Sequence, residues 1–154
     1  MLSEAMRAQL RDQLKTFNDL YSNFSPEVWE QKPDSGKWSA RENLAHLARY
    51  HEVFLDRLQR IQQQDSPQFA RYRAEDDPEW ARWSPLDLPA LTRRIRKLRD
   101  CVIEAVSGLS DRQLARTGIH PALGELTVPQ WIEFFLLHEA HHLYKTLFLL
   151  RTES

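Results

Sequence analysis

The feature that most constrains the fold of this chain is the recurrence of apolar residues at spacings of three and four in four long segments. This spacing gathers apolar side chains on one face of an α-helix. Glycine is scarce, and Leu, Ala, Arg, Glu and Gln, which favour helices, dominate. Four amphipathic helices predict an all-α fold, a four-helix bundle. The expected helices run over residues 2–23, from 39 to about 64, from 84 or 87 to 108, and from 127 to about 151.

Sequence signals for helix starts support these boundaries. A Ser or Thr followed three residues later by Glu or Gln has the spacing of a capping box, and both Ser39–Glu42 and Thr127–Gln130 fit it. The third helix can begin at Ser84-Pro85 or at Asp87, and Gly108 suits its end. Single helical turns are expected at residues 25–27 and 110–113.

Residues 65–85 form a long connection between the second and third helices. A simple turn between helices needs about 2–8 residues, so this segment is long enough to follow the length of the bundle. The second and third helices would then be parallel, and the fourth antiparallel to the second. The connection contains four aromatic residues that either cover the mouth of a pocket or pack the segment onto the bundle: Phe69, Tyr72, Trp80 and Trp83.

Composition limits the classes of function. The net charge is −1 and acidic and basic residues are intermixed, which argues against a nucleic-acid-binding protein. Cys101 is the only cysteine, so no intrachain disulfide forms, in keeping with a reducing compartment. Neither a signal peptide nor a run of apolar residues long enough to cross a membrane is evident. We therefore expect a soluble cytoplasmic protein with a single domain over residues 1–154.

The apolar stretch LLHEAHHLYKTLFLL, residues 136–150, contains three histidines. His138 and His142 are one helical turn apart and continue the apolar stripe of Trp131 and Phe135, so they should face the interior. Two neutral imidazoles placed in this way can share a transition-metal ion. The alternative is a pair of histidines hydrogen-bonded to neighbouring core groups.

A third imidazole strengthens the metal interpretation. His46 lies seven residues after the cap Ser39, and His142 lies nine residues before Arg151. At about 1.5 Å per residue, antiparallel helices would bring the two side chains to similar heights. A histidine satisfied within the core remains the alternative for His46. No comparable argument for metal binding applies to two other histidines. His51 lies on a different helix face, and His120 lies in a loop before a proline.

The remaining polar residues near these histidines have several possible roles. His138–His142 also fits H-E-x-x-H, the zinc-protease motif in which the glutamate is the general base. Only twelve residues follow, and no strand pattern suggests a substrate-binding sheet, so we do not expect a protease. Glu139 is then a base, a residue that orients a ligand, or a solvated carboxylate. His141 is a residue that supports the ligands, a surface residue or an interface residue.

Two stretches of the chain contain recognisable motifs. Residues 38–47, WSARENLAHL, fit the pattern W-S-x-x-E-x-L-x-H-L, and residues 127–147 contain H-x-x-x-H at His138 and His142. With both motifs the chain resembles the DinB-like family of bacterial metal-binding four-helix bundles. The resemblance covers essentially the whole chain. It implies an up-down-down-up bundle and a divalent metal held by His46, His138 and His142. Lys145 departs from the pattern, since relatives often have glutamine there.

The resemblance also bears on partners. Homodimers are common in the family, and residues 131–148 are apolar on more sides than one core face requires. We therefore expect a homodimer.

A site of three neutral histidines leaves the charge of the metal uncompensated and a coordination position open, as in catalytic sites. Such a site can activate water or bind a thiol as thiolate. We expect a metal-dependent enzyme that acts on a small molecule by hydrolysis or by transfer of a low-molecular-weight thiol. The alternative is a non-catalytic metal- or ligand-binding dimer of a stress-related kind. Zinc or nickel suits the ligands best, and cobalt or iron also fits. Tyr50, one turn after His46, is a pocket residue or a structural one.

Overall fold

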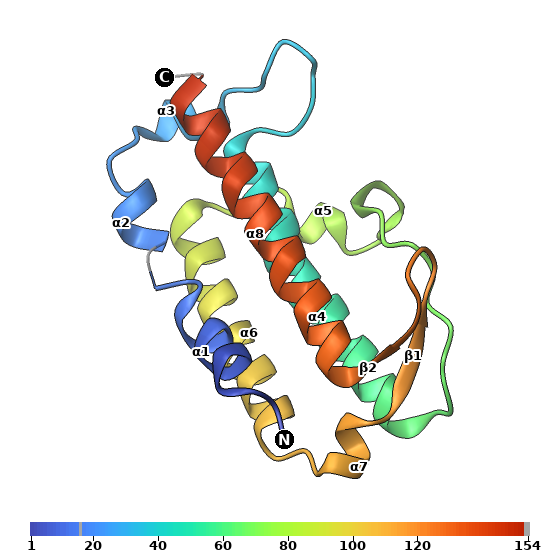
Figure 1. Ribbon diagram of the computed structural model, residues 1–154. Coiled ribbons are helices and arrows are strands. Elements are labelled where there is room, and N and C mark those ends of the chain that lie inside the picture. The colour runs from blue at the N-terminus through green and yellow to red at the C-terminus, as the bar shows by residue number, and fades with distance from the viewer. Residues whose placement is uncertain (16, 153–154) are drawn as a thin grey trace.

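The structure, a computed structural model, describes residues 1–15 and 17–152 and is a four-helix bundle with a small β-hairpin at one end (Figure 1). The elements follow in chain order: α1 (Glu4–Asp12), α2 (Phe17–Tyr21), α3 (Pro26–Glu30), α4 (Ala40–Gln63), the 3-10 turn η1 (Ala74–Asp76), α5 (Trp80–Trp83), α6 (Leu88–Ser107), α7 (Asp111–Leu114), β1 (Thr117–His120), β2 (Gly124–Thr127) and α8 (Val128–Thr152).

The bundle has the expected up-down-down-up order. Figure 1 shows α1 rising, α4 and α6 both descending, and α8 rising again beside α4. Helix α4 packs against both α6 and α8. The long connection between α4 and α6 makes this parallel pair possible, as its length predicted. No helix in the described part of the chain is both long and apolar enough to span a membrane.

Side-chain caps fix where the long helices begin. The Ser39 hydroxyl accepts a hydrogen bond from the Glu42 N–H, and the Glu42 carboxylate accepts one from the Ser39 N–H, completing the predicted capping box. Asp87, the second of the two predicted starts, caps α6. At the start of α8, the Thr127 N–H donates to the Gln130 side chain at 2.9 Å.

The expectation of one continuous helix over residues 2–23 is wrong. Helix α1 ends at Asp12 and α2 begins at Phe17, with a turn over residues 13–15; residue 16 lies outside the described residues. The side-chain amide of Gln13 donates to the Leu136 carbonyl of α8 at 3.0 Å. This tertiary contact ties the end of α1 to α8, which helical periodicity in one segment cannot foresee.

The β-hairpin corrects two further expectations, since we expected no strand and placed His120 in a loop. Strands β1 and β2 are antiparallel, with His120 opposite Gly124 in the register. Gly124 adopts a φ of 76°, which glycine tolerates without strain. A Cβ at Gly118 would lie only 2.8 Å from the Phe69 ring, so this glycine lets the connection pack closely on β1. Strands of four residues are too short to be recognised in the sequence from an alternation of apolar and polar residues.

Candidate metal centre

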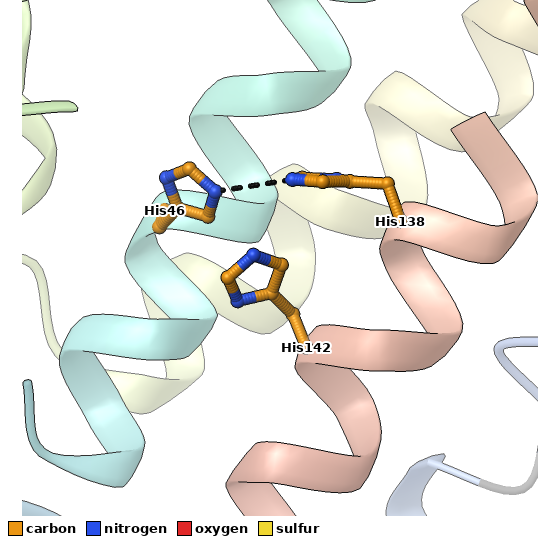
Figure 2. Close-up of side chains that lie close together, drawn as sticks. All are labelled: His46, His138 and His142. Atoms are coloured by element: carbon orange, nitrogen blue, oxygen red, sulfur yellow. Dashed lines mark hydrogen bonds between the residues drawn. The ribbon is translucent and has the colours of Figure 1, made fainter. Parts of the chain in front are cut away.

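Three imidazoles from two helices meet on one side of the bundle. His46 projects from α4, and His138 and His142 project from successive turns of α8 (Figure 2). The Nε2 atoms of His46 and His138 lie 3.3 Å apart. One ring nitrogen from each of the three histidines lies within 4.8 Å of the others. The antiparallel packing of α4 and α8 thus brings together residues 92 or more positions apart in the chain.

Asn43, one turn before His46, determines which nitrogen of His142 carries a proton. The Asn43 side-chain amide donates to the Ser39 carbonyl at 3.0 Å, so its Oδ1 atom faces Nδ1 of His142 at 3.2 Å. Because Oδ1 is only an acceptor, Nδ1 of His142 must be the donor. This leaves the Nε2 lone pair of His142 free to bind an electrophile.

All three imidazoles are neutral at physiological pH. Burial lowers the pKa of His46 to about 4. Burial is also the largest cause at the other two, lowering the pKa of His138 to about 2 and that of His142 to about 3; interactions with neighbouring histidines lower both further, and Lys145 adds to the effect at His142. Neutral imidazoles keep the lone pairs that a metal ion requires.

The closest pair of ring nitrogens has the spacing that tetrahedral coordination of a metal ion requires. In tetrahedral coordination with Zn–N bonds of about 2.0–2.1 Å, two ligand nitrogens are about 3.3 Å apart. This matches the separation of Nε2 of His46 and Nε2 of His138. The group contains no carboxylate or thiolate. Three neutral ligands are typical of catalytic rather than structural zinc sites.

Aromatic rings surround the centre. Tyr72 stacks on His46 with ring centroids 5.6 Å apart, and Trp38 lies 5.0 Å from the same imidazole. Trp80 stacks on Trp38 at 5.2 Å. Two of the four aromatics in the connection therefore lie at or near the site, as the pocket-mouth interpretation predicts. The other two, at positions 69 and 83, are buried in the core.

Tyr50 contacts the centre through its ring and not its hydroxyl. Its ring centroid lies 4.0 Å from that of His138. Its hydroxyl accepts a hydrogen bond from the Arg57 guanidinium at 3.0 Å. Arg57 in turn donates to the carbonyl of Ala70. Tyr50 thus packs beside a candidate ligand while joining α4 to the long connection.

The interpretation of Glu139 as a solvated carboxylate is wrong. Its side chain is fully buried and lies on the inner side of α8, away from solvent. One carboxylate oxygen is paired with Arg99 and lies 3.1 Å from Nε2 of His51, and the other accepts a hydrogen bond from Gln13 at 2.7 Å. Burial raises the pKa of Glu139, but His51 and Arg99 outweigh it and hold the pKa below its ordinary value. Glu139 is therefore ionised.

The other histidines have separate positions. His51 is fully buried, and its Nδ1 lies 2.9 Å from the Leu47 carbonyl. Sequence reasoning gave it no role because its carboxylate partner, Glu139, lies on another helix. His120 accepts hydrogen bonds from the N–H groups of the hairpin turn that follows it. His141 is exposed and lies edge-on to His142, with ring centroids 5.2 Å apart.

Comparison with known families supports the resemblance seen in the sequence. Residues 9–144 match the model of the DinB superfamily. The chain belongs to the DinB superfamily.

Three proteins similar to this DinB-superfamily chain come from Bacillus subtilis. The uncharacterized protein YuaE of strain 168 is 30% identical over 143 residues, which cover 84% of this chain and 87% of YuaE. The structure of YfiT, described as a probable metal-dependent hydrolase with an unusual four-helix bundle topology, superposes with a TM-score of 0.80 at 16% identity, covering 98% of this chain and 89% of YfiT. The DinB-like protein YjoA gives a TM-score of 0.61 at 17% identity, covering 96% and 90%.

The low pKa values of the three imidazoles predict a steep loss of stability in acid for the metal-free protein. In the unfolded chain each imidazole has a pKa of about 6.5, whereas in the folded protein the values are lower. Unfolding therefore takes up protons below pH about 6.5, and stability falls as pH falls. Near pH 5 the three groups together contribute a slope of up to about 4 kcal/mol per pH unit.

Urea unfolding of the chelator-treated protein between pH 7 and pH 4.5 measures this slope. A variant with asparagine at positions 46, 138 and 142 is the control and should show a clearly shallower dependence. Equal slopes for the two proteins would contradict the neutral, buried state of the three imidazoles.

Proposed function

We propose that this chain is a divalent-metal-dependent enzyme that acts on a small molecule, by hydrolysis or by transfer of a thiol. The proposed metal ligands are His46, His138 and His142. The observation that supports the proposal most strongly is the convergence of three neutral imidazoles, with ring nitrogens as close as 3.3 Å, in a group without a carboxylate. The description of the structural relative YfiT as a probable metal-dependent hydrolase points the same way.

The chain's own residues would prepare the site for such chemistry. A metal ion with three neutral ligands acts as a Lewis acid that activates bound water near neutral pH or stabilises a thiolate. Asn43 accepts a hydrogen bond from Nδ1 of His142, which keeps the proton there and leaves the Nε2 lone pair free to bind a metal ion. The rings of Trp38, Tyr50 and Tyr72 exclude water from the flanks of the imidazoles. Exclusion of water strengthens electrostatic interactions at the reacting centre.

An open groove on the far side of Tyr72 from His46 has a volume in the range of small-molecule sites. It has a volume of about 500 Å³ and lies between α4 and the connection, with Tyr72 and Arg57 in its lining. Small-molecule sites commonly have volumes of about 300–1,000 Å³. Tyr72 lines this groove and also stacks on His46, whereas none of the three histidines lines the groove itself.

The experiment that tests this function is an activity survey of protein reconstituted with zinc, nickel, cobalt or iron. Ester, amide and phosphoester substrates are tested without thiol, and alkyl-halide and epoxide electrophiles with several low-molecular-weight thiols. We expect one class to be turned over, and His46→Ala to lose at least about 100-fold in kcat/KM, since the variant loses a ligand. His141→Ala, which alters an exposed imidazole on the helix that carries His138 and His142, should retain activity and metal content.

Metal-loaded protein that turns over nothing across this panel would contradict an enzymatic role and favour a non-catalytic metal- or ligand-binding protein. Activity that persists at full strength in His46→Ala would contradict the proposed ligands. Thiol-dependent turnover identifies a transferase, and thiol-independent turnover identifies a hydrolase.

We also propose that a second copy of this chain is its protein partner. Leu137, Tyr144 and Phe148 are 62%, 66% and 54% exposed and lie along one face of α8. An apolar row on one straight helix can pair with the same row of an antiparallel copy, which is the isologous contact of a two-fold dimer. Sedimentation velocity should show a dimer that Tyr144→Glu dissociates and that Lys97→Glu, an exposed change on α6, leaves intact. A monomeric native protein would contradict this proposal.

A further inference from the structure

Segments from all four long elements of the bundle meet at the buried carboxylate of Glu139. Gln13 at the end of α1, His51 of α4 and Arg99 of α6 each contact it. We call these four side chains the Glu139 network. His51 and Glu139 are fully inaccessible to solvent, and Arg99 is 4% exposed.

The network tolerates little movement of its members. An ionised carboxylate in the core is stable only while its partners remain in place, since loss of one partner leaves charge uncompensated away from water. The other contacts of these partners fix them further. Arg99 donates to the Leu10 carbonyl, and Gln13 donates to the Leu136 carbonyl as well as to Glu139. Both ring nitrogens of His51 face oxygen atoms.

The same two helices carry the network and the candidate metal ligands at neighbouring positions. On α8, Glu139 directly follows His138 and precedes His142 by three residues. On α4, His51 lies five residues after His46. The Glu139 carboxylate pairs with Arg99 of α6, whereas His138 and His142 face His46 of α4 (Figure 2).

The rotation and height of α8 relative to α4 decide whether the three imidazoles converge. A slip of one residue turns a helix by about 100° and moves it about 1.5 Å along its axis. Such a slip would separate Glu139 from His51 and would also carry His138 and His142 away from His46. The Glu139 network therefore fixes both the rotation and the height of α8 relative to α4, on which the geometry of the metal centre depends.

We propose that Glu139 is a positioning residue for the metal centre, which it preorganises from the core side by fixing α8 against α4. This inference rests on the proposed ligation by His46, His138 and His142. Glu139 does not touch the reacting atoms, because its carboxylate is enclosed by Gln13, His51 and Arg99. Its effect reaches the metal through the backbone of α8.

Cobalt(II) titration of the full-length protein tests the proposal, with visible absorption as the readout of coordination geometry. Glu139→Gln keeps the shape of the side chain but removes its charge. We expect it to weaken cobalt affinity about 10- to 100-fold, as loss of residues that orient ligands does elsewhere, and to change the intensity and position of the absorption bands.

The control for a general loss of stability is Leu150→Ala, which removes a fully buried side chain from α8 eight residues after His142. It should lower the melting temperature but leave cobalt affinity and the spectrum as in the native protein. Gln13→Ala, which removes only one donor to the carboxylate, provides a milder change should Glu139→Gln fail to fold. It should weaken cobalt binding about two- to tenfold.

Native affinity and an unchanged spectrum in Glu139→Gln, or in Gln13→Ala if the former does not fold, would overturn the proposal. The same holds if Leu150→Ala perturbs cobalt binding as strongly at an equal loss of melting temperature. His46→Ala keeps the two claims separate: if it binds cobalt like the native protein, the ligand assignment itself fails, whatever the network does.

Discussion

The structure depends above all on the antiparallel packing of α8 against α4. Phe54 of α4 and Phe135 of α8 are both fully buried and stack with their ring centroids 4.2 Å apart. This apolar contact lies one turn from the candidate metal centre along α8. Both helices are long and capped at their starts, so a single height of α8 relative to α4 holds along the whole length of the pair. The three imidazoles meet because of this arrangement, and residues of α1, α6 and the connection add the Glu139 network and the aromatic rings around the centre.

Helix α8 separates two kinds of polar chemistry on its two sides. One side presents neutral imidazoles, whose low pKa values result mainly from burial. The other side presents the ionised Glu139, whose charge is balanced by Arg99. A neutral ligand set leaves a bound dication with its full charge available for a substrate, while the charged set is enclosed in the core. The division explains how a helix as apolar as α8 retains three buried or half-buried polar side chains, His138, Glu139 and His142, in its middle turns.

Much of the fold could be predicted from local sequence signals. The capping box at Ser39, the start at Asp87 and the length of the connection together indicated a bundle with parallel second and third helices, and the family resemblance implied its up-down-down-up order. The break after Asp12 and the hairpin around Gly124 could not be predicted, since both depend on contacts with distant segments. In the first case Gln13 binds α8, and in the second Phe69 packs on Gly118.

The candidate site divides in the same way. His138 and His142 were visible as a pair one turn apart, and helix heights brought His46 to them. Asn43 and Trp38 were missed, although Asn43 lies three residues before His46 and so on the same helix face, a signal that was available. The burial of Glu139 and His51 could not be predicted from the sequence of either helix alone, since Glu139 is paired with Arg99 on a third helix.

The most direct test of the central claim is X-ray diffraction from zinc-soaked crystals, with data collected on both sides of the zinc absorption edge. The account predicts one strong anomalous peak per chain, about 2.0–2.1 Å from one nitrogen of each of His46, His138 and His142. A peak that lacks any of these three side chains, or no peak at this position at saturating zinc, would contradict it.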